Sequence, residues 1–188
     1  DSSFVENTAT EGGGLNNNNG NTANLVNVTF FENSASVGGG INNHGLLNLL
    51  HTTISNNSAT GHPSGGVFNA GVMNYTNSII ANSSGIDCYN ATSFGTININ
   101  KNNLVEANGE SPNGCGTPAI ADDPQLDSLA NNGGLTNTMA LLSGSPAIDG
   151  GDDANCPEFD QRGVKRPQGG HCDIGAYEKI VHYVQQDA

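Results

Sequence analysis

Apolar residues recur through the first half of the chain at intervals close to 25 residues. Phe4, Phe30, Ile54 and Ile80 are separated by 26, 24 and 26 positions. Two further sets share this spacing, namely Leu15, Ile41 and Val67, and Leu25, Leu49 and Tyr75. Between residues 46 and 54 apolar and polar residues roughly alternate, which is typical of a half-buried strand. The pattern predicts a repeated unit of short strands, one unit for each coil of a solenoid.

Asparagines repeat at the same intervals as the apolar residues. Equivalent residues of successive parallel coils lie about 4.8 Å apart, a spacing at which stacked Asn amides hydrogen-bond to each other. We predict two structural ladders, formed by Asn7, Asn33 and Asn57 and by Asn17, Asn43 and Asn69. His51 shares the register of Asn27 and Asn77, so we interpret it as a polar substitute in another ladder.

The segments between the apolar positions decide the fold class. They are rich in Gly, Asn, Ser and Thr, which are poor helix formers, and this argues against a leucine-rich repeat with its helical half. We predict an all-β chain that forms a single right-handed parallel β-helix with an irregular C-terminal cap. Residues 1–105 form the coils, and residues 106–188 form the cap region and a tail strand, continuous with the solenoid.

Charge limits the partners that the chain can have. The formal net charge is −13, with 18 acidic and 5 basic residues, and Lys101 is the only basic residue before Arg162. Because phosphate groups are neutralised by Lys and Arg, this composition excludes nucleic acid as a partner. The sequence also contains no run of about 20 apolar residues, so we expect no membrane insertion.

The cysteines indicate the compartment. Cys88, Cys115, Cys156 and Cys172 form no CxxC pair. An even number of cysteines in a Gly- and Asn-rich acidic chain indicates two disulfides and an oxidising environment, so we expect a secreted or cell-surface protein. Pairing in sequence order is the most economical of the three arrangements, and free buried thiols are the alternative.

Three segments of the second half support a family resemblance. They read NNGGLTNTMALLSGSPAIDGG (residues 131–151), DQRGVKRP (residues 160–167) and CDIGAYE (residues 172–178). They resemble the C-terminal region of bacterial choice-of-anchor Q proteins, and the repeats resemble coils of that family and of polymorphic outer-membrane proteins. The resemblance implies an exported parallel β-helix and transfers no catalytic residue. It also implies a C-terminal sorting segment in many members, from which the ending KIVHYVQQDA departs.

An acidic cluster suggests one candidate cation site. Asp149, Asp152 and Asp153, with Asp160 close in sequence, could supply oxygen ligands to Ca²⁺, and no other cofactor is expected. The alternative is structural. In that interpretation Asp149 caps a turn and Asp160 pairs with Arg162, a geometry that would stabilise a loop.

Two segments suggest self-association. The chain opens inside a repeat at Phe4, and an uncapped solenoid edge is a template for another strand. The tail residues Ile180, Val181, Tyr183 and Val184 have high β-propensity. We predict a head-to-tail contact in which the N-terminal edge receives the C-terminal end of another copy. The alternative is a tail that packs on its own domain.

We therefore expect a structural or adhesive extracellular module, a surface stalk or a fibre subunit. The alternative is a β-helix that binds or cleaves glycans. Cleavage requires clustered carboxylates or a basic residue. Residues 1–86 contain no Lys or Arg, and their only acids are Asp1, Glu6, Glu11 and Glu32. Glu6 and Glu32 share a register as a pair of like charges. Ice binding is a third option, although no sustained TxT pattern is present.

Overall fold

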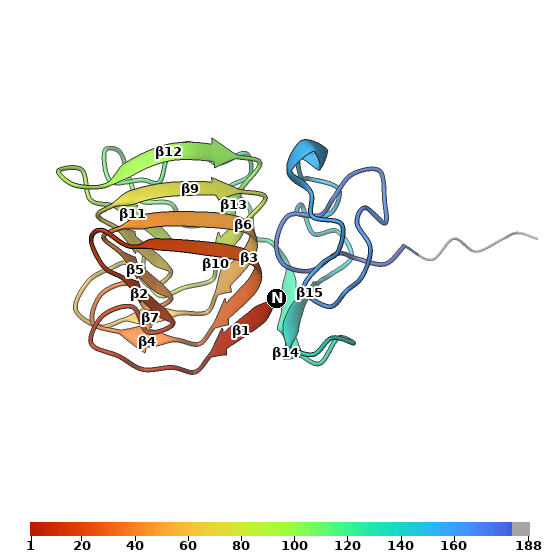
Figure 1. Ribbon diagram of the computed structural model, residues 1–188, viewed down its shortest axis with the longest axis horizontal. Coiled ribbons are helices and arrows are strands. Elements are labelled where there is room, and N and C mark those ends of the chain that lie inside the picture. Colours follow the sequence, from red (N-terminus) through yellow and green to blue (C-terminus); the bar gives the residue numbers. More distant parts are fainter. Residues whose placement is uncertain (182–188) are drawn as a thin grey trace, which may run out of the picture.

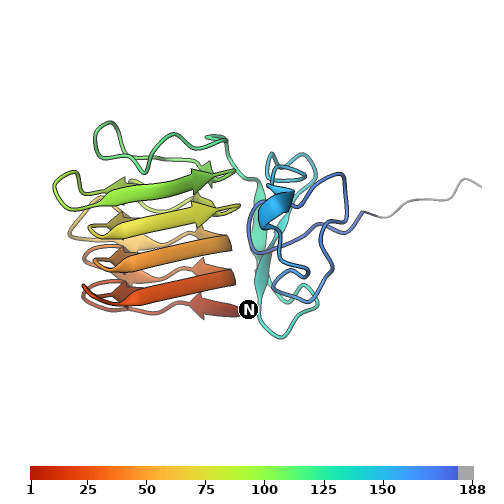
Figure 2. The same cartoon turned by 45° about the horizontal axis from the view of Figure 1, so that its top comes forward.

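The computed structural model describes residues 1–181, which form a stack of parallel β-coils with an irregular segment along one side (Figures 1 and 2). The strands are β1 (Ser2–Val5), β2 (Leu15–Asn17), β3 (Thr22–Phe31), β4 (Ser34–Ala35), β5 (Ile41–Asn43), β6 (Leu46–Ser55), β7 (Ser58–Ala59), β8 (Val67–Asn69), β9 (Val72–Thr76), β10 (Ile79–Ala81), β11 (Cys88–Asn90), β12 (Thr96–Lys101), β13 (Leu104–Val105), β14 (Leu126–Ala130) and β15 (Thr138–Leu141). One 3₁₀ turn, η1, covers Asp153–Asn155. The predicted all-β parallel solenoid is confirmed.

The coils have three main faces. The long face consists of residues 22–26, residues 46–50, β9 and β12. The covered face consists of β1, residues 28–31, residues 52–55, β10 and β13. The short face consists of β2, β5, β8 and β11. Because β3 and β6 are ten residues long, each of them bends from the long face onto the covered face.

The predicted registers are confirmed. Phe4 pairs with Phe30, Phe30 with Ile54 and Ile54 with Ile80, and the row ends at Val105. The other two predicted apolar rows also pair coil by coil, through Leu15, Ile41 and Val67 and through Leu25, Leu49 and Tyr75. All three rows point into one core cluster. Burying apolar rows in this way is the main source of stability of the stack.

Two corners of each coil use left-handed backbone. Between the long and covered faces it occurs at Asn27, His51, Asn77 and Asn102, with φ of 54°, 47°, 49° and 48°. Between the covered and short faces it occurs at Glu6, Glu32, Asn56 and Asn82, with φ of 55°, 52°, 59° and 58°. Asn tolerates this conformation better than most residues, and this explains its recurrence at the corners. His51 occupies the register predicted for it, and its Nε2 lies 2.9 Å from Asn77 Nδ2.

The C-terminal segment, residues 122–181, lies along the covered face, whereas the predicted cap would close an end of the stack (Figure 2). Its backbone and side chains bond to residues that point outward from this face: Thr29 Oγ1 donates to Gln161 Oε1 (2.7 Å), and Ala176 N donates to Thr53 Oγ1 (2.9 Å). A second apolar cluster, which includes Ile79, Leu104 and Ile174, lies between them. The covered face is therefore buried on both sides.

Both predicted disulfides are present. Cys88 pairs with Cys115 and Cys156 pairs with Cys172, with Cα–Cα distances of 5.8 and 6.4 Å. Cys115 is fully buried in the core cluster, where its carbonyl accepts a hydrogen bond of 2.6 Å from Tyr75 Oη. The first disulfide therefore ties the loop after β13 to the last coil. Two disulfides indicate an oxidising compartment. No helix among residues 1–181 is long and apolar enough to cross a bilayer.

Candidate functional site

A groove runs along the third corner of the coils, and one predicted Asn ladder builds that corner. Asn17, Asn43 and Asn69 are buried, and each donates its Nδ2 to the Oδ1 of the next, at 2.7 Å. Asn90 continues the row, because Asn69 Nδ2 donates to its Oδ1 at 2.7 Å. Asn43 and Asn69 also brace the turns that follow them: Asn43, for example, donates to the Gly45 carbonyl and accepts from Gly45 N, both at 3.2 Å. The predicted ladder is therefore confirmed and has one more member.

Glycines at this corner let successive coils stack closely. Gly45, Gly71 and Gly95 lie in successive coils just before the long-face strands. A Cβ at Gly71 would collide with the carbonyl oxygen of Gly45, and a Cβ at Gly95 with that of Asn69. Here glycine permits close approach of backbones. Gly45 and Gly71 also line the groove, so part of its floor is backbone without side chains.

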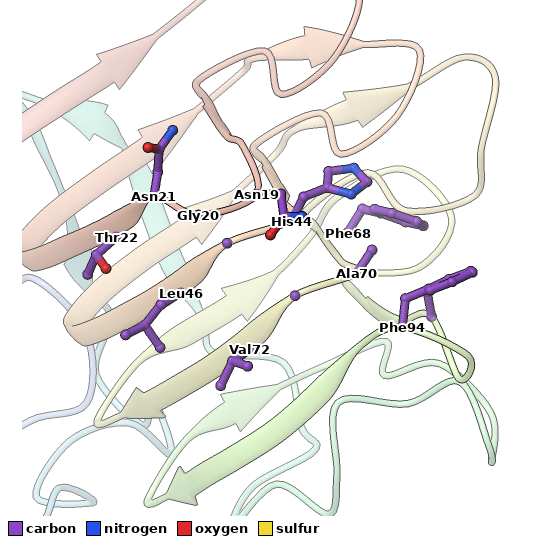
Figure 3. A pocket seen from close by; sticks show the side chains of 13 residues that line it. Asn19, Gly20, Asn21, Thr22, His44, Leu46, Phe68, Ala70, Val72 and Phe94 are labelled. Carbon is purple, nitrogen blue, oxygen red and sulfur yellow. The ribbon is translucent and has the colours of Figure 1, made fainter.

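The groove has a volume of about 880 Å³ and crosses the coils (Figure 3). One wall is the first outward residue of three long-face strands, Thr22, Leu46 and Val72, which are paired side by side. The opposite wall and ends come from the turns, and the full lining is Asn19, Gly20, Asn21, Thr22, His44, Gly45, Leu46, Phe68, Ala70, Gly71, Val72, Ala91 and Phe94. The lining thus repeats with the coil spacing, about 4.8 Å.

Aromatic side chains form one end of the groove. Phe94 stands on the turn between β11 and β12 and is 79% exposed. Phe68 lies beside it in Figure 3 and stacks on Tyr89, with ring centroids 5.7 Å apart and planes at 7°. His62 contacts the Phe68 and Tyr89 rings edge-on, at 5.0 and 4.6 Å. These contacts make Phe68 a rigid part of the wall, whereas Phe94 is free to meet a ligand.

The chemistry of the lining is neutral. It offers amide groups from Asn19 and Asn21, the Thr22 hydroxyl and the His44 ring beside apolar surface. Within the described residues, the groove lining contains no Asp, Glu, Lys or Arg. The arrangement can therefore form hydrogen bonds and stack on a ring, but it supplies no paired carboxylates for hydrolysis. Sequence reasoning missed this site because its signal, a glycine at the same corner of three coils, also fits a purely structural corner.

The second predicted ladder is also present, and it lies away from the groove. Asn7 Nδ2 donates to Asn33 Oδ1 and Asn33 Nδ2 to Asn57 Oδ1, both at 2.9 Å. A further ladder on the long face was not predicted. It consists of Asn24, Asn48, Asn74 and Asn98, joined by hydrogen bonds of 2.7, 2.7 and 2.9 Å. This row faces outward, so its amides stiffen the sheet without filling the core.

The four aspartates of the candidate Ca²⁺ site are each engaged elsewhere. Asp152 forms an ion pair with Lys101 and Asp153 with His171, both at 2.7 Å. Asp149 accepts a hydrogen bond from His171 N, and Asp160 receives both Nε and Nη2 of Arg162 at 2.9 and 2.7 Å. Across residues 1–181 no three such side chains converge on a cation position. The alternative Asp160–Arg162 pair is confirmed.

The interior of the C-terminal segment is rich in buried charge. Arg166 and Glu178 are both fully buried at their side chains and lie 2.7 Å apart. Glu178 also accepts from Asp173 N and Gln168 N. Burial raises the pKa of Asp173 to about 6, despite hydrogen bonds from backbone amides. The cluster is fully enclosed, so removing either member of the Arg166–Glu178 pair would leave the other charge buried without compensation.

The residues predicted for self-association are placed in part. Phe4 stacks on Phe30, with centroids 4.7 Å apart, in the first coil. Ile180 and Val181 are 42% and 38% exposed and belong to no strand, so this described part of the predicted tail strand is absent. Tyr183 and Val184 lie outside the described residues. The head-to-tail contact stays a prediction.

Comparison with protein-family models, curated proteins and solved structures finds no match to this chain. The resemblance to choice-of-anchor Q proteins therefore also stays a prediction, supported only by the sequence segments and repeats quoted above. What the geometry establishes independently is a parallel solenoid with one open, neutral and partly aromatic groove along its third corner.

Proposed function

We propose that this chain is a structural and adhesive module of the extracellular space. The observation that carries the proposal is the groove, an exposed binding surface built on ladder-braced coils. Inward Asn amides pair with each other and with the corner backbone, so the surface is rigid before any ligand arrives. The two disulfides suit an extracellular location, where such bonds persist.

Adhesion is favoured over glycan cleavage by the chemistry of the same surface. The lining supplies stacking and hydrogen-bonding groups, which hold a ligand, and lacks the carboxylate pair that glycoside hydrolysis uses. A stack in which each coil is joined to the next by parallel strand pairing on several faces is also suited to a stalk. Head-to-tail assembly of such modules would extend the stalk, and it is a separate part of the proposal.

Adhesion is testable with beads that carry the native protein. The beads are passed over surfaces coated with neutral polysaccharides, anionic polysaccharides, mucin or collagen, and the shear stress that detaches them is measured. Beads that carry protein denatured in reductant are the control. We expect the native beads to resist shear on at least one surface on which the control beads detach. Equal detachment of native and control beads from every surface would contradict the proposal.

A further inference from the structure

We infer that the corner groove binds a neutral linear polysaccharide, whose sugar rings stack on Phe94 and whose hydroxyls bond to the Asn and Thr rim. This inference rests on the adhesive function proposed above and names its ligand class. Three observations favour this occupant over the others that a groove could hold. They are the charge of the lining, the hydrogen bonding of the backbone around it, and the repetition of its residues from coil to coil.

Charge selects a neutral ligand. The lining contributes no ionised carboxylate, Lys or Arg, so it offers a charged polymer no counter-charge. The whole chain carries a formal charge of −13, which repels polyanions such as uronate-rich or sulfated glycans. A polycation would be attracted to the exposed acids elsewhere on the surface and gain nothing from this groove. A neutral chain is the remaining class.

The backbone argues against a peptide ligand. Extended peptides bind by adding a strand to a free sheet edge. Of the strands that border the groove, β6 and β9 are paired on both sides by neighbouring coils, whereas residues 22–26 of β3 pair only with β6. The turns are bonded between coils as well. Leu46 N donates to Asn21 O at 2.9 Å, Val72 N to Gly45 O at 2.8 Å and Thr96 N to Gly71 O at 2.7 Å. A peptide strand added to the free edge of β3 would run parallel to β3 and not along the groove, which crosses the coils, so the groove itself provides mainly side-chain contacts.

Equivalent lining residues recur from coil to coil, as equivalent units recur along a polymer. Thr22, Leu46 and Val72 present one wall position in each of three coils, and Gly45 and Gly71 present the same floor in two. Four coils contribute residues, so the groove is roughly 14 Å long at the usual spacing between parallel strands. That length accommodates a few sugar units. An aromatic ring at one end, with apolar surface beneath and amides at the rim, matches the apolar faces and polar edges of pyranose rings.

Affinity electrophoresis in native gels tests the inference. The acidic protein migrates through gels that contain hydroxyethylcellulose, glucomannan, xylan or dextran, and through gels that contain polygalacturonate or alginate. We expect retardation by at least one neutral polymer and by neither anionic one. Phe94→Ala removes the stacking ring, and Val72→Trp fills the groove from a position that is 38% exposed. Each substitution should weaken binding about ten-fold or more, given the apolar contact that is lost or blocked.

Phe159→Ala is the matched control. Phe159 is 46% exposed and lies on the C-terminal segment, outside the groove, so its loss should leave retardation unchanged. Thermal unfolding of each variant shows that the fold is intact. The inference is overturned if no neutral polymer retards the protein, if Val72→Trp and Phe94→Ala bind as the wild type does, or if only anionic polymers bind. Bead adhesion that persists in Phe94→Ala and Val72→Trp would leave the adhesive function standing and place its ligand elsewhere.

Discussion

The side-chain amide of a buried Asn at the third corner forms hydrogen bonds in two directions, to the next coil and to its own turn. Asn43 donates to Asn69 Oδ1 in the next coil and exchanges two hydrogen bonds with Gly45 in its own turn. Asn48 occupies the outward ladder of the long face, where water can replace its partners. Asn43 and Asn48 are the same residue type and lie in the same coil, but replacing each of them with Ala should change the free energy of unfolding by a different amount.

Asn43→Ala should lower the free energy of unfolding by about 2 kcal/mol, because it leaves the Gly45 backbone and the Asn17 amide unsatisfied in a buried site. Asn48→Ala should cost under about 1 kcal/mol, since its neighbours can bond to solvent. Urea unfolding followed by circular dichroism measures both. Equal losses for the two variants would show that the inward ladder carries no special stabilising role.

His51 makes one coil corner sensitive to acid. Burial, with the nearby Arg166 charge, lowers the pKa of His51 from 6.5 to about 3. Between these values the unfolded chain binds a proton at His51 and the native chain does not. This histidine therefore contributes stability above pH 6.5 that is lost progressively as the pH falls towards 3. Asp173 acts in the opposite direction, because its raised pKa favours the native state as the pH falls below about 6.

His51→Asn isolates the histidine contribution, since Asn already occupies this corner in the neighbouring coils. We expect the free energy of unfolding of the wild type to fall, relative to that of His51→Asn, as the pH is lowered from 7 to 4. Urea titrations of both proteins at each pH measure this difference. A difference that does not change with pH would mean that His51 is protonated equally in the native and unfolded states.

At the scale of elements, the C-terminal segment and the covered face depend on each other. The outward residues of that face include Ile79 and Leu104, which are fully buried only because the segment lies over them. The segment is in turn stabilised by its buried Arg166–Glu178 pair. Removing one member of a buried ion pair is costly because the other charge is left without compensation.

Glu178→Gln should therefore destabilise the protein by roughly 3 kcal/mol. Glu158→Gln, an exposed change in the same segment, should alter stability by less than about 0.5 kcal/mol. Guanidinium unfolding measures the loss of stability, and limited proteolysis shows where the chain opens. In Glu178→Gln, the first cleavage should fall in the C-terminal segment, after residue 121. A Glu178→Gln protein as stable as the Glu158→Gln control would refute the proposed coupling.

The elements also show how far the sequence could predict this structure. Registers and two ladders could be predicted, because a period near 25 residues places equivalent residues next to each other in any parallel solenoid. Both disulfides could be predicted for a different reason, the even number of cysteines and the economy of pairing them in sequence order. The long-face ladder of Asn24, Asn48, Asn74 and Asn98 has the same spacing and could have been found in the same way. Whether the side chains of this ladder point outward, however, depends on where the corners of each coil fall, and the spacing alone does not show this.

The position of the C-terminal segment was harder to predict. Unbroken apolar or small-residue runs such as TFF (residues 29–31) and SIIA (residues 78–81) are the signal for a sheet buried on both sides. The row predicted from Phe30 and Ile80 uses only one side of these runs, so it does not show that the C-terminal segment covers their other side. The groove was harder still to predict from the sequence, because Phe94 belongs to no repeat and reaches the groove only through the path of the turn between β11 and β12.

At the scale of the whole molecule, the Cys88–Cys115 bond ties the loop after β13 across the last coil, next to the core residue Tyr75. A cross-link of this span restricts the unfolded chain by about 3 kcal/mol. The double variant Cys88→Ser with Cys115→Ser should lower the free energy of unfolding by that amount. Thermal unfolding in oxidising buffer measures it, and a melting temperature equal to that of the wild type would show that the loop needs no cross-link.

The central claim is that the third corner of the coils is a binding site for a neutral glycan. An NMR titration of the ¹⁵N-labelled protein tests it most directly, with oligosaccharides from whichever neutral polymer retards the protein. We expect amide shift changes concentrated at the turns around Gly45, Gly71 and Phe94, saturating with increasing ligand. Shift changes concentrated on the C-terminal segment or the outward Asn ladder, or none with any neutral oligosaccharide, would contradict it.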